Sequence, residues 1–173
     1  DKRSGDFLLA PPKYAAAAEP SDDVALKPPV FANGPNDRRV SADTLNCSRA
    51  ILVRELLLEL GDGGTAIWAG NWGWNSLPDD WRGRPSIWGQ TSADGQAAWT
   101  VAALERAWRE WPWMGLMFLE NWTPGAAADD PRWGFSIAGR PAANALADWL
   151  AAQPPDVAAP GFPLARPDDP SQR

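Results

Sequence analysis

Apolar residues recur along this chain with a spacing that changes from segment to segment. Over residues 46–60 they return every three or four positions, which predicts an amphipathic helix, and Gly61 follows where a C-terminal cap is expected. The same helical spacing returns over residues 93–110, after hydroxyl side chains that can cap a helix. A third helix is predicted over residues 141–152, with Pro141 in its first turn.

Two apolar runs of strand length lie between these helices. Residues 65–70 and 113–119 are mostly apolar, which predicts two buried strands. The first run is followed by the residues NWGWN and the second by ENW, so each predicted strand ends in aromatic and side-chain amide groups. Shorter strands are predicted over residues 133–137 and, near the N-terminus, over residues 7–10.

The order of these elements predicts an α/β fold. Strands that alternate with helices form parallel β/α units, and ligands of such units bind beyond the carboxyl ends of the strands. We therefore expect the two aromatic clusters, NWGWN and ENW, to lie side by side at the edge of the sheet that the carboxyl ends of its strands form, which we call the rim. Residues 1–152 are expected to form a single domain, in which residues 1–45 are mostly loop or extended and rich in proline; residues 153–173 are expected to form a Pro-rich tail.

The aromatic and amide side chains at the predicted rim suit a sugar site. Indole faces stack on the apolar faces of pyranose rings, and amides hydrogen-bond to sugar hydroxyls. The candidate contacts are Trp72, Trp74, Asn75 and Trp122, and the alternative is a Trp-rich corner of the core. Glu120 is the best candidate for an acid or base, provided that an apolar wall raises its pKa; a solvated or arginine-paired carboxylate is the alternative.

Composition removes several classes of function. Among 173 residues the chain has no histidine and one cysteine, Cys47, so Ser-His-Asp and Cys-His catalysis and a Cys-based zinc site are excluded. We expect no metal and no cofactor. The formal net charge of -6 without a basic run argues against nucleic acid as a partner. No apolar run is long enough to cross a membrane, and no signal peptide is visible. A secreted or cell-surface location is expected rather than a cytoplasmic one.

A series of local patterns, in order, resembles a known family over residues 46–150. Together they resemble the C-terminal part of clan A glycoside hydrolases, which are retaining (β/α)8 barrels such as β-xylosidase-like and cellulase-like enzymes. The patterns are LVREL through Gly61-Asp62, the strand and NWGWN ending of residues 67–75, Gln96-Ala97, WPWMG at residues 111–115, and Asp130-Pro131 through Phe135 with Pro141-Ala142.

The resemblance implies a partial TIM barrel whose catalytic site is impaired. The family's nucleophilic glutamate would fall at Asn71, and an amide cannot attack an anomeric carbon. The partner acid/base glutamate belongs to a strand that this sequence does not contain. Residues 1–45 would hold the preceding strand, with Tyr14 near the nucleophile position.

The functional expectation is therefore a glycoside hydrolase-like protein that binds an oligosaccharide. Another polypeptide segment or subunit is expected to complete the barrel, because a partial barrel exposes strand edges. The alternative is a non-catalytic structural or docking subunit of a larger assembly.

Overall fold

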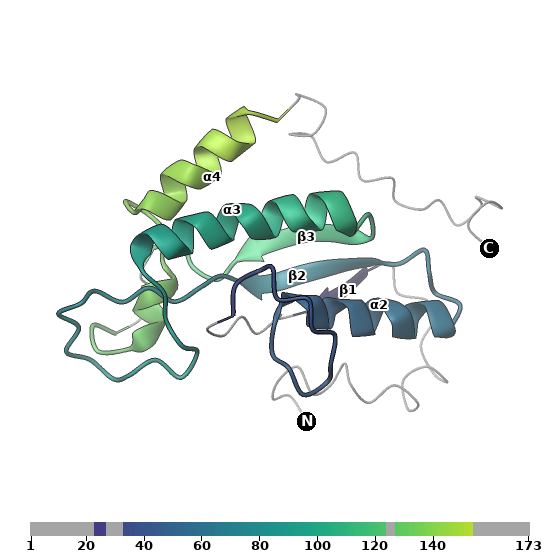
Figure 1. The fold of residues 1–173 in the computed structure, drawn as a ribbon, viewed down its shortest axis with the longest axis horizontal. Helices are drawn as coiled ribbons and strands as arrows, with labels where there is room; N and C mark the ends of the chain where they lie inside the picture. Colours follow the sequence, from purple (N-terminus) through teal and green to yellow (C-terminus); the bar gives the residue numbers. More distant parts are fainter. Residues whose placement is uncertain (1–22, 27–32, 124–126, 154–173) are drawn as a thin grey trace.

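The structure of the protein is a computed structural model that describes residues 23–26, 33–123 and 127–153 (Figure 1). Tyr14, the strand predicted over residues 7–10 and the tail from residue 154 onward lie outside the described residues. None of the helices in the described ranges combines the length and the apolar character that a membrane crossing requires.

A three-stranded parallel sheet forms the centre of the molecule. Its strands are β1 (Asp23–Leu26), β2 (Ala66–Trp72) and β3 (Met114–Leu119), in the spatial order β1-β2-β3. In register, Val24 lies opposite Ile67, and Ile67 lies opposite Met114. The predicted α/β class with parallel strands is confirmed at this level, because both strand pairs are parallel and helices connect them in sequence.

Helices α2 (Ala50–Glu59), α3 (Ala93–Glu110) and α4 (Pro141–Ala151) follow the predicted ranges. The short 3-10 helix η2 (Cys47–Arg49) leads into α2, and the Asn46 side chain caps η2 by accepting the Arg49 N–H at 3.1 Å. Ser92 caps α3 in the same way through the Gly95 N–H at 3.0 Å. Local capping and periodicity thus determine where these helices begin.

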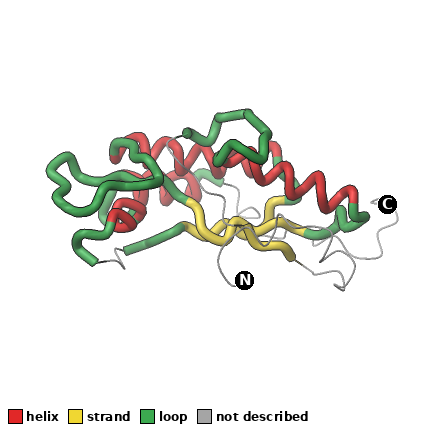
Figure 2. The backbone as a smooth tube through the Cα atoms, turned by 90° about the horizontal axis from the view of Figure 1, so that it is seen from below, coloured by secondary structure: helices red, strands yellow, loops and turns green. Residues whose placement is uncertain are grey.

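All three helices lie on one side of the sheet (Figure 2). Helices α2 and α3 share core clusters with residues of the sheet, and α4 packs against α3. The largest core cluster lies between the sheet and α2 and α3. It consists of small residues and large aromatic ones, namely Ala50, Ala69, Trp72, Trp74, Ala103, Ala107, Trp111 and Met114.

The second face of the sheet stays open within the described part of the chain. Leu116 and Phe118 are 37% and 46% exposed, although the sequence predicts a fully buried strand there. Trp68 lies on this face as well, because its ring is 6.1 Å from that of Phe118 and a Cβ at Gly115 would come within 2.5 Å of it. The prediction is wrong for this face because an apolar run alone does not reveal which side the helices cover.

One other expectation differs from the structure, and another gains detail. Strand β1 lies within the segment that is expected to be mostly loop or extended and to hold the preceding strand; its four residues are too few for a periodic signal, and it pairs with β2. The strand predicted over residues 133–137 is replaced by the 3-10 helix η3 (Pro131–Phe135). There Asp130 caps the turn and Pro131 occupies its first position, so local hydrogen bonds outcompete sheet pairing; one isolated bridge joins Asn121 and Ser136.

Candidate functional site

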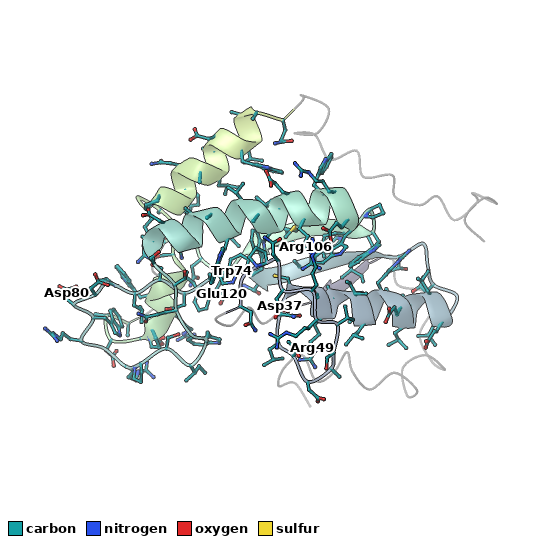
Figure 3. All side chains as sticks on the ribbon, viewed as in Figure 1. Asp37, Arg49, Trp74, Asp80, Arg106 and Glu120 are labelled. Atoms are coloured by element: carbon teal, nitrogen blue, oxygen red, sulfur yellow. The ribbon has the colours of Figure 1, made fainter. Side chains whose placement is uncertain are left out.

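The carboxyl ends of β2 and β3 lie side by side. Trp72 is opposite Leu119, and the Glu120 N–H donates to the Trp72 carbonyl at 2.8 Å. Figure 3 shows Trp74 and Glu120 close to these strand ends, next to the large loops that follow them. The expectation that the NWGWN and ENW segments meet on one rim is confirmed by this pairing.

Trp72 and Trp74 turn into the core at this rim. They are 3% and 1% exposed, and their rings meet edge to face at 6.0 Å. Trp74 also contacts Trp99 at 5.9 Å and donates its indole N–H to the Asn33 carbonyl at 2.9 Å. Neither ring offers a face to a ligand in this structure. The predicted role in sugar stacking is therefore corrected for both, and the alternative of a Trp-rich core corner describes them.

The backbone at Gly73 explains this inward turn. Its φ of 150° is a conformation that side chains rarely adopt, and it lies between the two buried tryptophans. Asn75 is buried as well, with 2% exposure, and its side-chain N–H donates to the Pro131 carbonyl at 2.6 Å. Asn75 therefore ties the loop after β2 to the segment after β3, and it does not face a ligand.

Three side chains of the predicted site remain accessible at the rim. Asn71 and Glu120 are partly buried, and Trp122 is 59% exposed. The Trp122 backbone is nevertheless held, because its carbonyl accepts the N–H groups of Ile137 and Ala138 at 3.2 and 2.8 Å. An amide among the last residues of β2, and a carboxylate and an anchored indole just beyond β3, thus lie at the carboxyl ends of two adjacent strands.

Glu120 also influences its surroundings electrostatically. The pKa of Arg132 is raised, chiefly by hydrogen bonding to Asp130 and by the charge of that residue, and to a smaller extent by the charge of Glu120. An arginine therefore lies within the electrostatic reach of Glu120, which agrees with the alternative of a carboxylate balanced by arginine.

Hydrogen bonds from the Gln96 and Arg140 side chains form a junction that holds the loop after β2 to the segment after β3. Gln96 is 1% exposed, and its side-chain N–H group donates to the carbonyls of Trp74 at 2.7 Å and Gly134 at 2.9 Å. Arg140 donates to the Ser76 carbonyl at 2.7 Å. Local patterns do not reveal this junction, because both partners are distant backbone atoms. The one signal in the sequence that could have indicated the role of Gln96 is a polar side chain on the buried face of a helix.

Several charged side chains near the loops form ion pairs within the fold. Asp130 accepts from Arg132 at 2.7 Å and lies 3.2 Å from Arg84. Arg38 pairs with Glu110, and Arg39 pairs with Asp37 at 2.6 Å. In the described ranges no three His, Cys, Asp or Glu residues lie close enough together to hold a metal ion.

Comparison of the chain with protein-family models, curated proteins and solved structures gives no match. The interpretation of the rim therefore depends on its own chemistry.

Proposed function

We propose that this chain is a carbohydrate-binding protein related to glycoside hydrolases, and that its rim holds an oligosaccharide without hydrolysing it. The proposal depends on one observation: the Glu120–Trp72 backbone hydrogen bond joins the ends of two parallel strands. In this proposal the side chains that bind the ligand come from both strand ends, Asn71 from one and Glu120 and Trp122 from the other. A partial (β/α)8 barrel is the fold that we propose for such a rim, because barrels place their sites at the carboxyl ends of parallel strands.

Each accessible side chain has a role that fits a sugar. The Trp122 indole, which is 59% exposed, stacks on the apolar face of a pyranose ring. The Asn71 amide and the Glu120 carboxylate accept hydrogen bonds from hydroxyl groups, and the amide also donates. The buried rings of Trp72 and Trp74 belong to the core that supports the rim, and they do not touch the ligand.

The rim lacks the groups that glycoside hydrolysis requires. A retaining enzyme uses two carboxyl groups about 5–5.5 Å apart, one of them as the nucleophile. Across residues 71–75 and 120–123, Glu120 is the single carboxylate, and Asn71 occupies the position that the family resemblance assigns to the nucleophile. Binding without turnover is therefore the activity that we propose.

Titration with xylo-, cello- and manno-oligosaccharides, followed by tryptophan fluorescence and calorimetry, tests this function. We expect one of these series to bind, and Trp122→Ala to weaken binding about tenfold or more, because truncating a central aromatic contact costs about 2 kcal/mol or more. The matched control is Trp108→Ala, an indole with 52% exposure near the end of α3, where the chain enters β3 at the opposite end of the sheet. A flat response to every sugar, or equal losses in both variants, would contradict the proposal.

The open face of the sheet favours a second candidate function, that of a docking subunit. An all-parallel sheet is normally covered on both faces, yet Leu116 and Phe118 are exposed here. The strands follow one another in order, with every described helix on the other face, which is how the strands of a barrel are arranged. The partner that fits this face is another polypeptide segment that contributes further parallel strands with apolar side chains.

A further inference from the structure

The turn of residues 33–37 contacts the core beneath the rim through the main chain of Asn33. The Asn33 carbonyl accepts the indole N–H of Trp74 at 2.9 Å, and Trp74 is 1% exposed. The turn is closed by the Asp37 N–H, which donates to the Gly34 carbonyl at 3.2 Å. The position of the Asn33 carbonyl is therefore coupled to a buried ring.

The nitrogen of the same peptide group is not held. Among the residues that the structure describes, neither the Gly34 N–H nor the Asn33 side-chain amide has a hydrogen-bond partner, and both residues are partly exposed. Glycine has no side chain that would shield this nitrogen, and a Cβ at Gly34 would lie only 3.2 Å from the Trp99 ring. Covalent connectivity keeps the Gly34 nitrogen within reach of the side-chain carbonyl carbon of Asn33.

We propose that Asn33–Gly34 is a site of spontaneous covalent modification, at which the asparagine converts to aspartate and isoaspartate with water as the co-reactant. The Gly34 nitrogen attacks the side-chain carbonyl carbon of Asn33, and the new C–N bond closes a succinimide ring. The bond to the side-chain nitrogen breaks, and that nitrogen leaves as ammonia with the proton that Gly34 gives up. Water then opens the ring, no electron is transferred, and the formal net charge becomes one unit more negative than its present value of -6.

The two products differ at the atom that Trp74 binds. When water attacks the side-chain carbonyl of the ring, aspartate forms and the main chain is restored. When water attacks the main-chain carbonyl, isoaspartate forms: the chain now runs through the former side-chain carbon, and the carbonyl that accepts the Trp74 indole N–H becomes a free carboxylate. Isoaspartate thus adds a carbon to the main chain and a charge beside a buried ring, so we expect it to destabilise the core there.

Asn75 lacks this freedom, although a small residue also follows it. Its side-chain N–H donates to the Pro131 carbonyl at 2.6 Å, and the Ser76 N–H donates to the Gly134 carbonyl at 2.9 Å. Both the leaving group and the attacking nitrogen are held, and Asn75 is 2% exposed. We therefore expect no conversion at Asn75.

Asn36 is an internal control within the same turn as Asn33. It is exposed, but the nitrogen that follows it belongs to Asp37, which carries a side chain and donates its N–H to the Gly34 carbonyl. Conversion at Asn33 without conversion at Asn36 would show that the free nitrogen of Gly34, and not exposure alone, selects the site.

Incubation of the full chain at mildly alkaline pH, followed by tandem mass spectrometry, tests the site. Conversion raises the mass of a peptide by the difference between a hydroxyl and an amino group, and a protein isoaspartate methyltransferase labels the isoaspartate. Asn33→Gln should abolish conversion, because the longer side chain closes its ring far more slowly, and it retains the carbonyl that Trp74 binds. Asn36→Gln is the matched control and should convert at the wild-type rate.

Urea denaturation of the separated forms tests the coupling to Trp74. The isoaspartate form should have a lower midpoint than the unmodified protein, and its tryptophan fluorescence should change. Asn33→Asp carries the new charge on an unaltered main chain, so its midpoint should stay closer to that of the wild type. Near-UV circular dichroism establishes that each variant is folded.

Three results would overturn the proposal. Absence of conversion at Asn33 in the folded protein, or equal conversion at Asn36, would contradict the site, and an isoaspartate form with the wild-type midpoint would contradict its coupling to the core. Trp122→Ala should convert at the wild-type rate, so a failure of the proposed sugar site leaves these outcomes unchanged.

Discussion

Asp130 is the residue whose ionisation is coupled most clearly to the fold near the rim. Its carboxylate caps η3 by accepting the Arg132 N–H at 2.9 Å, and it forms ion pairs with Arg132 and Arg84. Hydrogen bonding from the Arg132 side chain is the main reason that the pKa of Asp130 falls to about 2. The same contacts position η3, and with it the loop that the Asn75 and Gln96 side chains hold.

The lowered pKa of Asp130 predicts a pH-dependent contribution to stability. Because its pKa is lower in the folded state than the ordinary value of about 3.9, the contribution is complete above about pH 5 and is lost as the pH falls toward 2. Asp130→Asn, which preserves the capping oxygen, should therefore lower the urea midpoint at pH 7, and the difference from the wild type should shrink at acidic pH. Urea denaturation between pH 7 and pH 3 measures both effects.

Asp80→Asn is the control for this prediction, because it removes an exposed carboxylate from the turn in the preceding loop. The urea midpoint of Asp80→Asn should stay close to that of the wild type at every pH from 7 to 3. A constant difference between Asp130→Asn and the wild type at every pH would show that the charge of Asp130 does not contribute.

At the scale of elements, the junction around Gln96 determines how the loops after β2 and β3 are placed. One side chain from the first turn of α3 bonds the carbonyls of Trp74 and Gly134, one from each loop. The Ser76 N–H also donates to the Gly134 carbonyl at 2.9 Å. The loops therefore move as one unit with the helix, and a rigid element supports the rim.

Gln96→Leu should loosen this unit. The substitution leaves the Trp74 carbonyl without its side-chain donor, so we expect a loss of about 1–3 kcal/mol in the free energy of unfolding. Hydrogen exchange should become faster in residues 73–76 and 131–136, while the far end of β3 keeps its protection. Gln90→Leu, in an exposed loop position, is the matched control. Unchanged exchange in both loops would show that the junction is not needed to hold them.

At the scale of the whole molecule, the distribution of helices leaves the sheet asymmetric. Trp68, Leu116 and Phe118 form an apolar patch on the face of the sheet that no described helix covers; Leu116 and Phe118 are exposed and Trp68 is half-buried. An exposed aromatic patch on a sheet is typical of an interaction surface. This asymmetry is the physical basis of the docking candidate, since further strands would bury the same patch.

Phe118→Lys tests whether this face is open in the isolated protein. If it is, the change should alter the free energy of unfolding by no more than about 0.5 kcal/mol, as for other surface positions, and should reduce binding of the dye ANS. Leu58→Lys, at an exposed apolar position on α2, should leave dye binding unchanged. A loss of several kcal/mol in Phe118→Lys would instead mean that another part of the protein already covers the face.

The helices and the two long strands could be predicted from the sequence because their signals are local. Periodicity, the caps at Asn46 and Ser92 and the proline at residue 141 depend on neighbours within one or two turns. The meeting of the two strand ends was predictable for a related reason: successive parallel β/α units place their carboxyl ends together.

The sequence by itself thus determined the order of the elements and the rim on which polar and aromatic residues gather. Only the tertiary structure decided which tryptophans are available, burying Trp72 and Trp74 and exposing Trp122. It also decided where the register between β2 and β3 shifts, between Ile67 and Ala69 and again between Ala69 and Trp72. The physical reason is that burial and side-chain direction depend on which face the helices cover and on strand register, and both are set by contacts between residues far apart in the chain.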